Sequence, residues 1–194
     1  MSAPTPGPED PRLTLLAQDE ARRRAEACGV PDYMTDLSIF RVLLHHPRLA
    51  RALNDLLGTL LFDTALDQRL RELVIMRLGW TTGSVYEWTQ HWRIATALGV
   101  SPEDLVAVRD WEGDPRFGPA ERAVLAAVDD TMANGAVGAG TWEALRAHVS
   151  DDPVVLLELV AAIGTWRMVA AMLRTLAVPL EPGLEPWPPD GVGP

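Results

Sequence analysis

Apolar residues recur along most of the chain at intervals of three and four, and no stretch alternates strictly enough to predict a strand. Together with capping residues and glycines, this pattern predicts helices. The predicted helices cover residues 11–27, 37–46, 47–62, 66–80, 84–98, a short segment from 101, 119–133, 141–149 and 153–177. The sequence therefore predicts an all-α helical bundle, with an antiparallel helical hairpin at residues 66–98 as its centre.

Proline is concentrated at the two ends of the chain. Residues 1–11 contain four prolines and residues 179–194 contain six, so neither end is expected to continue a helix. We predict a flexible arm at 1–11, a single all-α domain at 12–178 and a Pro-rich tail at 179–194. The length of 194 residues is sufficient for one domain with a substantial core.

Composition excludes several kinds of chemistry. All 17 basic residues are Arg, so no lysine is available for a Schiff base, a pyridoxal-phosphate anchor or a phosphate loop. The net charge of −10 does not favour binding to nucleic acid. A single cysteine, Cys28, excludes an internal disulfide or a two-thiol redox centre. No secretory signal or long uncharged apolar run is evident, which predicts a cytoplasmic protein without membrane contact.

The central hairpin carries the candidate chemistry. Glu72 lies ten residues before the turn at Thr82, and His91 lies nine residues after it. At about 1.5 Å per residue, the two side chains are about equally far from the turn, and an antiparallel hairpin can bring them together. Histidine is the side chain best suited to moving protons near neutral pH.

The second helix of the hairpin places further polar groups beside His91. Ser84, Glu87, Trp88 and His91 share one helical stripe, and Glu87 precedes His91 by four residues. This predicts an imidazole between two carboxylates. Catalytic roles are therefore predicted for His91, Glu87 and Glu72, and a substrate pocket is predicted at Ser84, Tyr86, Trp88 and Trp92. Arg77, Arg93 and Arg167 are candidate cations for an anionic substrate.

Each of these features also has a simpler interpretation. Ser84 and Glu87 match a capping box at a helix start, and Glu72 can form a surface ion pair with a neighbouring arginine. Glu72, Glu87 and His91 could alternatively ligate a metal. A non-catalytic assembly module is a further alternative, with Trp111 and Trp187 as contact points between chains.

The hairpin sequence strongly resembles the carboxymuconolactone decarboxylase family of the alkylhydroperoxidase D-like superfamily. The resemblance rests on residues 66–75 and 85–91, on residues 40–47 upstream, and on residues 164–169 and 178–183 downstream. It extends over roughly residues 37–183 and implies an alkylhydroperoxidase D-like helical bundle. It also implies a homo-oligomer, often a trimer or a hexamer, with the site near a subunit boundary.

The resemblance also separates two chemistries. Peroxidase members carry Cys-x-x-Cys between the glutamate and the histidine, but Ser84 and Glu87 occupy those positions here. A hydroxyl and a carboxylate cannot cycle through a disulfide, so thiol peroxidase activity is not expected. Decarboxylase members keep the residues equivalent to Glu72, Glu87 and His91, although the lactone decarboxylase itself has a basic residue in place of Ser84.

The resulting prediction is a cofactor-free lyase or isomerase. It would act on a small organic acid, lactone or related ring compound, with His91 as general acid and base and with Glu72 and Glu87 fixing its tautomer. No cofactor or metal is expected.

Overall fold

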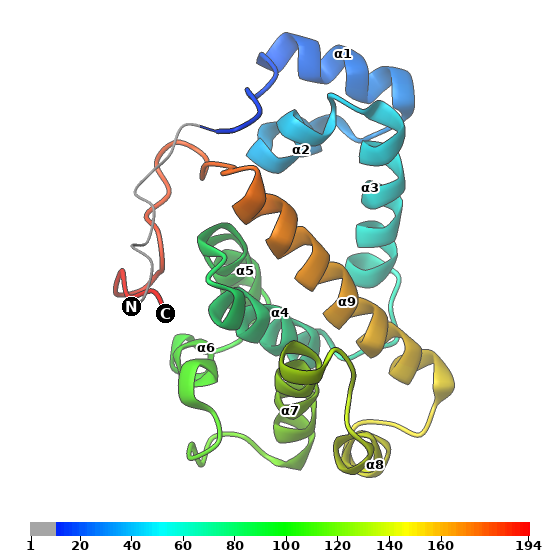
Figure 1. The fold of residues 1–194 in the computed structure, drawn as a ribbon, viewed down its shortest axis with the longest axis vertical. Helices are drawn as coiled ribbons and strands as arrows, with labels where there is room; N and C mark the ends of the chain where they lie inside the picture. Colours follow the sequence, from blue (N-terminus) through cyan, green and yellow to red (C-terminus); the bar gives the residue numbers. More distant parts are fainter. Residues whose placement is uncertain (1–10) are drawn as a thin grey trace. The chain divides into compact units, whose positions relative to one another are not determined.

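The structure is a computed structural model in which residues 11–194 are described, so the predicted arm lies almost entirely outside the described residues. Between residues 11 and 194 the regular elements are all helices, which confirms the predicted all-α fold (Figure 1). Two compact units are formed. One comprises residues up to Gly58 together with Met172–Leu184, and the other comprises Thr59–Ala171 together with Glu185–Pro194.

The first unit contains short helices. It holds α1 (Gln18–Cys28), the 3₁₀ helix η1 (Asp32–Asp36), α2 (Ser38–Leu43) and most of α3 (Pro47–Phe62). The first helix begins at Gln18, later than the predicted start at residue 11, because tertiary contacts hold the preceding residues. The Leu16 amide donates to the Arg41 carbonyl at 3.2 Å, and Arg41 Nε donates to the Leu16 carbonyl at 2.8 Å.

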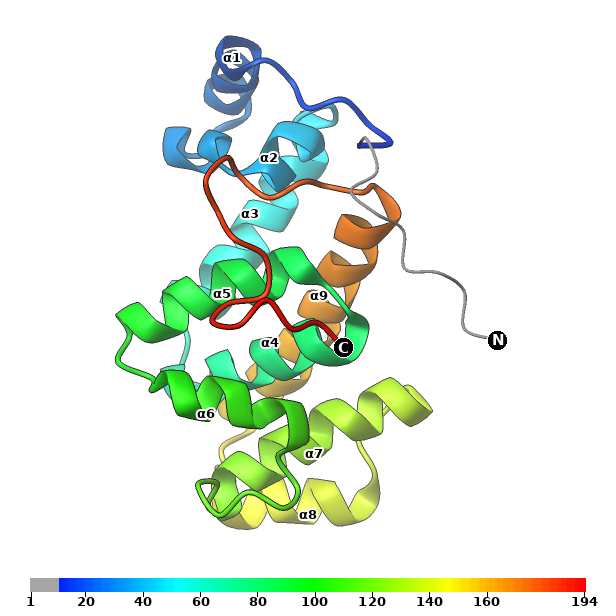
Figure 2. The same ribbon diagram turned by 90° about the vertical axis from the view of Figure 1, so that its left-hand side faces the viewer.

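The second unit carries the predicted site. Its helices are α4 (Gln68–Thr82), α5 (Val85–Ala97), α6 (Pro102–Ala107), the 3₁₀ helix η2 (Val108–Asp110), α7 (Pro119–Asn134), α8 (Ala139–His148) and most of α9 (Pro153–Thr175). Helix α4 packs against α5 on one side and α7 on another, and α8 packs against α7 (Figure 2). Helix α4 is therefore the central element of this unit.

Helices α4 and α5 form the predicted antiparallel hairpin. Asp67 caps α4 by accepting a hydrogen bond from the Leu70 amide at 3.0 Å. Gly83 ends the helix with φ of +67°, a left-handed conformation that favours glycine. The two helices approach closely at Gly79, where an added Cβ would lie 3.1 Å from the Trp88 backbone nitrogen. This close contact fixes the register of α5 against α4.

Helix α9 is the longest helix and the most apolar. Its Glu158 side chain accepts hydrogen bonds from Thr64 Oγ1 and from the amides of Ala65 and Leu66, at 2.7–2.8 Å, and so anchors the start of α4. An 18-residue window of α9 has a mean hydropathy of 1.8, enough by length and composition to cross a membrane. Within the protein, 44% of that window is buried, and core helices of soluble folds pass the same test.

Candidate active site

His91 is held between α4 and α9 by hydrogen bonds to both of its ring nitrogens. Nδ1 lies 2.8 Å from Glu72 Oε2, and Trp166 Nε1 donates to His91 Nε2 across 3.0 Å. The rings of His91 and Trp166 meet edge to face, with centroids 5.7 Å apart. The hairpin therefore brings Glu72 and His91 together as its spacing predicted, and His91 is buried.

These contacts define the tautomer of the imidazole. An indole N–H can only donate, so Nε2 must present its lone pair to Trp166. The proton of a neutral His91 is then assigned to Nδ1, from which it is donated to the Glu72 carboxylate. A substrate that uses Nε2 as a base must therefore replace the Trp166 N–H.

Glu72 is a buried carboxylate with two cationic or proton-donating partners. Arg71 Nε and Nη2 both donate to Oε1, at 3.0 and 2.9 Å, and Arg71 Nη1 donates to the Leu61 carbonyl at 2.9 Å. Burial alone would raise the pKa of Glu72, but interactions with His91 and then Arg71 outweigh it and lower the pKa below its ordinary value. Glu72 is thus a stable anion that orients the histidine.

Glu87 is in the opposite electrostatic situation. Within the described residues, both of its carboxyl oxygens are buried without a hydrogen-bond partner, and so is Ser84 Oγ. Burial raises the pKa of Glu87 well above its ordinary value, and the nearby Ser84 hydroxyl offsets this only in part. Burial therefore favours the protonated, neutral form of Glu87, which lies one helical turn before His91 on α5.

The structure differs from three of the local expectations. The Ser84 side chain makes no capping hydrogen bond, so the capping box is not formed. Glu87 does not hydrogen-bond to His91, whose nitrogens are already used by Glu72 and Trp166. In residues 11–194 no three His, Cys, Asp or Glu side chains form a metal-binding group, so the alternative metal site is not assembled.

Two of the predicted pocket residues, Trp88 and Trp92, belong to a cluster of indole rings on the hairpin. Trp88 and Trp92 stack with centroids 6.2 Å apart, and Trp88 also packs against Trp80 and Trp187. Tyr86 is buried. The structure thus assigns Trp88 and Trp92 to an aromatic cluster on the hairpin, and their predicted role as walls of a substrate pocket stays a prediction.

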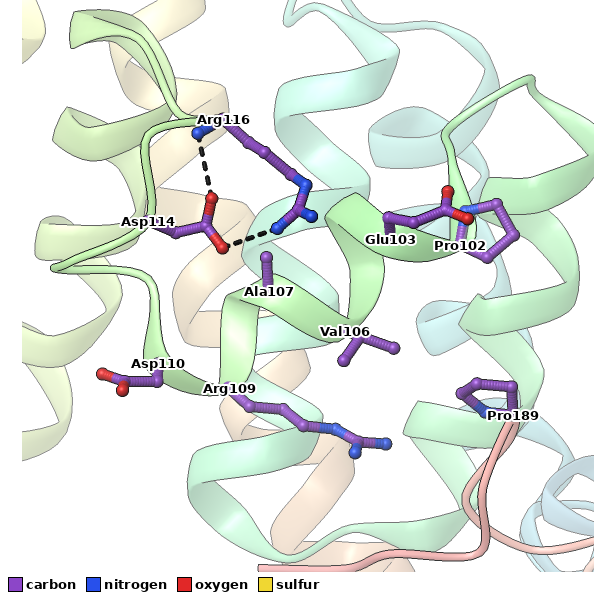
Figure 3. Close-up of a pocket in the computed structure, with 9 residues that line it drawn as sticks. All are labelled: Pro102, Glu103, Val106, Ala107, Arg109, Asp110, Asp114, Arg116 and Pro189. Atoms are coloured by element: carbon purple, nitrogen blue, oxygen red, sulfur yellow. Dashed lines mark hydrogen bonds and ion pairs between the residues drawn. The ribbon is translucent and has the colours of Figure 1, made fainter.

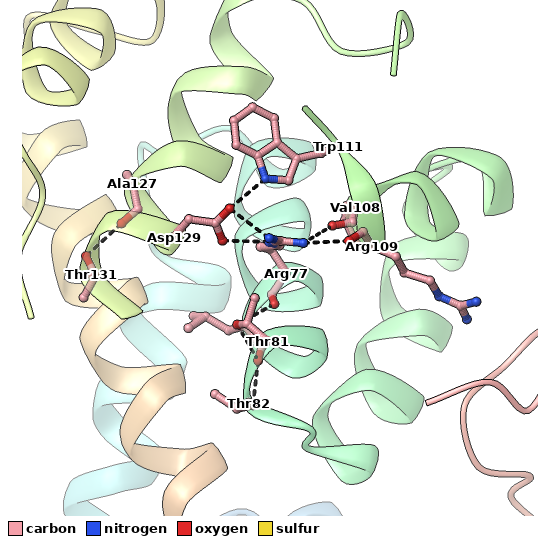
Figure 4. Close-up of polar contacts among 10 residues, drawn as sticks. Arg77, Thr81, Thr82, Val108, Arg109, Trp111, Ala127, Asp129 and Thr131 are labelled. Carbon is pink, nitrogen blue, oxygen red and sulfur yellow. Dashed lines mark hydrogen bonds and ion pairs between the residues drawn. The ribbon is translucent and has the colours of Figure 1, made fainter. Parts of the chain in front are cut away.

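Of the three candidate arginines, Arg77 has a structural role. It binds both oxygens of Asp129 at 2.7 and 2.8 Å and donates to the carbonyls of Val108 and Arg109 (Figure 4). Trp111 Nε1 donates to the same Asp129 carboxylate at 2.9 Å. This network fastens α4 to α7 and η2, and it leaves Arg77 committed to protein partners. The other two candidates, Arg93 and Arg167, are exposed.

A surface pocket of about 550 Å³ contains none of the predicted site residues (Figure 3). It lies beside α6 and η2, and its wall carries the charged side chains of Glu103, Arg109, Asp110, Asp114 and Arg116. Arg116 is paired with Asp114 at 2.7 Å. The opposite charges in this wall do not select for an anion or for a cation.

Two residues of the site were missed by sequence reasoning. Trp166 belongs to the 164–169 segment that carries the family resemblance, but local sequence gives no sign that it contacts His91. Arg71 was considered only as a surface ion-pair partner of Glu72, but both side chains are buried. Its position directly beside the candidate carboxylate was the available signal.

Comparisons with known proteins agree with this architecture. The model of the carboxymuconolactone decarboxylase family matches residues 47–130. An uncharacterized peroxidase-related protein from Ralstonia eutropha, with an alkylhydroperoxidase AhpD core, has a TM-score of 0.72 at 19% identity, covering 95% of this chain and 98% of its own. A peroxidase-related protein from a Silicibacter species has a TM-score of 0.71 at 15% identity, covering 93% and 97%.

A third similar structure has a described chemistry. The debrominase Bmp8, solved in complex with 2,3,4-tribromopyrrole, has a TM-score of 0.71 at 18% identity, covering 88% of this chain and 91% of its own. No curated protein matches the sequence. At these identities the solved structures establish the alkylhydroperoxidase D-like fold, and the similarity to the decarboxylase family rests on the matched residues 47–130.

Proposed function

The model of the carboxymuconolactone decarboxylase family matches residues 47–130, and we propose that this chain is a cofactor-independent lyase or isomerase. Its substrate would be a small organic acid, lactone or related ring compound. His91, Glu72 and Glu87 would move protons on that substrate. The debrominase neighbour was solved with a small ring compound, which supports a ligand of that size.

One observation carries the proposal. Glu72 contacts the imidazole of His91, Glu87 lies one helical turn before His91 on α5, and the surroundings of these two buried carboxyl groups shift their pKa values in opposite directions. These opposite shifts favour the ionised form of Glu72 and the protonated form of Glu87, and acid–base catalysis uses a division of this kind. Glu72 would hold the histidine, and Glu87 would supply a proton.

The chemistry follows from these protonation states. In an isomerisation, His91 Nε2 would take a proton from the carbon beside a carbonyl, and the electron pair would move onto the enolate oxygen. The imidazolium would then return the proton to a different carbon of the delocalised enolate, which regenerates the carbonyl and the neutral imidazole. In a decarboxylation, the bond to the carboxylate would break, carbon dioxide would leave, and Glu87 would protonate the carbanion. Water would then return a proton to Glu87. The unpartnered oxygens of Glu87 and Ser84 would meet polar groups of the bound substrate.

The test is a substrate screen with matched variants. Acetoacetate, oxaloacetate and γ-carboxylactones would be incubated with the protein, while carbon dioxide release and deuterium uptake from solvent are measured. His91→Gln is expected to lower the rate about 10²–10⁴-fold. His148→Gln replaces an exposed histidine and should leave it unchanged. Full activity of His91→Gln would exclude the proposed role and leave a binding protein as the alternative.

The absence of redox cysteines gives a separate arm of the same experiment. Cys28 lies in α1, and Ser84 and Glu87 occupy the positions where peroxidase members carry thiols. With an organic hydroperoxide and a dithiol donor, we expect no turnover above that of a Cys28→Ser variant. Cysteine-dependent reduction would show that the reactive thiol lies outside the predicted site.

We also propose that the chain forms a homo-oligomer. Exposed apolar side chains of α9, among them Val154, Leu157 and Met168, lie at helical spacing on one face. An extended apolar stripe of this kind is typical of a surface that a partner covers.

A further inference from the structure

The C-terminal segment, residues 185–194, occupies a defined site on the α4–α5 hairpin. Its Trp187 ring packs edge to face against Trp80, with centroids 6.0 Å apart, and at 45° against Trp88, with centroids 5.9 Å apart. The Trp187 amide donates to Thr89 Oγ1 at 3.3 Å, and Trp88 Nε1 donates to the Pro188 carbonyl at 2.8 Å. Figure 2 shows the segment lying over this hairpin.

A charged contact completes the site three residues after the indole. Arg109 binds both oxygens of Asp190, at 2.8 and 2.9 Å, in a fork geometry. The same guanidinium lies over Trp80 and Trp88, 4.8 and 4.9 Å from their ring centroids. The site thus contacts an indole ring, a main-chain carbonyl and a carboxylate, which follow one another along the segment. Cation–π contacts orient the arginine.

The C-terminal segment has a turned conformation that its own hydrogen bonds hold. The Gly191 amide donates to the Trp187 carbonyl at 2.8 Å, and the Val192 amide donates to Asp190 Oδ1 at 3.1 Å, so the segment turns on itself. It forms no strand or helix with the domain, and residues 179–184 before it are also without helix or strand. A preformed segment on an irregular connection loses little conformational freedom on binding and can reach a second molecule.

We propose that the site formed by Trp80, Trp88, Thr89 and Arg109 is an interaction site for the C-terminal segment of a second copy of this chain. Every copy carries both the site and the segment that fits it, so exchange between copies replaces each contact by an identical one. Terminal exchange of this kind is a low-cost route to association. The intramolecular segment competes at an effective concentration in the millimolar range for a short connection.

The surroundings of Arg109 support a site that can open. Arg109 Nε is buried without a hydrogen-bond partner in the described residues, whereas the paired Asp190 side chain is 41% exposed. The open pocket of about 550 Å³ adjoins the same arginine and is also lined by Pro189. Release of the segment would uncover the fully buried Trp88 ring and the hydrogen bond of its indole nitrogen, whereas Pro189 and Asp190 are already exposed.

The first experiment uses a synthetic peptide of residues 185–194 and full-length protein. The double variant Trp187→Ala with Asp190→Ala keeps the site but disables its own segment. We expect calorimetry to show one-to-one peptide binding to this variant, at least about tenfold tighter than to the wild-type chain. Glu185→Gln, an exposed acidic residue of the segment without an assigned role here, is the matched control and should behave as wild type.

Two further arms test the chemistry of recognition. Adding Arg109→Gln to the double variant should abolish binding, and a peptide with Asp190→Asn should bind about fivefold more weakly because the fork is lost. Circular dichroism establishes that each variant is folded. The single variant Asp190→Asn, which keeps the indole, provides a milder release if the double variant does not fold. If a folded variant with a disabled segment does not bind the peptide, the proposal is overturned.

The second experiment tests exchange between copies. The double variant, with an open site, is mixed with the Arg109→Gln variant, which has an intact segment but a defective site. We expect this pair to associate at least about tenfold more tightly than two copies of the double variant, which measures association through any other surface. Equal association in the two mixtures would show that the segment acts only within its own chain. Because no catalytic residue is changed, this result is independent of the proposed function.

Discussion

Glu87 is a buried acid whose protonation is coupled to the stability of the fold. Its pKa is raised by burial, so the native state keeps this proton to higher pH than the unfolded state. Stability is then fully present below the ordinary value of 4.5 and is lost as the pH rises towards the native value. The slope is about 1.4 kcal/mol per pH unit in that window.

Glu87→Gln should remove the loss of stability that accompanies a rise in pH. The variant is expected to gain melting temperature relative to wild type as the pH is raised from 4.5 to 9, measured by thermal unfolding at each pH. The matched variant Glu72→Gln removes a carboxylate with a lowered pKa, whose contribution is present above 4.5 and lost on acidification. It should therefore be most destabilised at neutral pH. A pH-independent difference for Glu87→Gln would show that Glu87 is ionised in the native protein.

Trp166 donates the hydrogen bond that His91 Nε2 accepts. In Trp166→Phe the N–H donor is lost while most of the ring volume stays, so we expect a loss of about 1–3 kcal/mol in the free energy of unfolding. Nitrogen-15 spectra of labelled histidine should show Nδ1 protonated in wild type and Nε2 released from its hydrogen bond in the variant. An Nε2-protonated ring in the wild-type protein would contradict the assigned tautomer.

The residues of the site differ in how far the sequence could predict them. Glu72 and His91 lie at nearly equal distances from one turn, so helix geometry alone brought them together. Trp166 is 75 residues beyond His91, and its contact depends on how α9 packs in the second unit. The absence of a capping hydrogen bond from Ser84 could not be predicted from the sequence either. Local sequence favours a capping box, whereas the Ser84 side chain is buried and makes no such bond.

At the scale of elements, the close approach of α4 and α5 depends on Gly79. A Cβ at this position would lie 3.1 and 3.4 Å from the backbone nitrogen and Cα of Trp88, and backbone cannot move as a flexible side chain can. Gly79→Ala is therefore expected to destabilise the protein by about 1–3 kcal/mol, measured by urea denaturation. The shift of α5 should also disturb the distance between Glu72 and His91.

Gly58 offers the matched control for this prediction. It lies within α3, it is partly exposed, and an added Cβ would meet nothing within 4 Å. Gly58→Ala should stabilise the protein by about 0.5–1 kcal/mol through helix propensity alone. If both substitutions stabilised the protein, the close helix contact at Gly79 would be refuted.

Element boundaries followed the sequence where local chemistry decides them. The short helix after Ser101 begins as predicted, with the Ser101 side chain accepting from the Asp104 amide at 3.1 Å and Pro102 in the first turn. Residues 11–17 were predicted as helix because of their apolar spacing. They are instead irregular, because backbone contacts such as that between the Arg12 amide and the Leu176 carbonyl outweigh local propensity.

At the scale of the whole molecule, α9 has an exposed apolar face of the kind that a partner molecule commonly covers. Leu157 is 71% exposed, and Val154, Val160 and Met168 are also exposed along the same face of the helix. Leaving such a stripe in water is unfavourable by roughly 25 cal/mol for each Å² of apolar surface. The family resemblance implies a trimer or a hexamer, and we propose that its interface covers this face of α9.

Leu157→Glu together with Met168→Glu should therefore disrupt self-association, because two carboxylates would be buried in the proposed interface without partners. Light scattering should show a mass near that of the 21.2 kDa chain for this variant and a multiple of it for wild type. Leu13→Glu, at an exposed apolar residue outside α9, is the control and should leave the mass unchanged. A wild-type chain that is monomeric at micromolar concentration would remove this proposal, and the apolar stripe would then have to serve another surface.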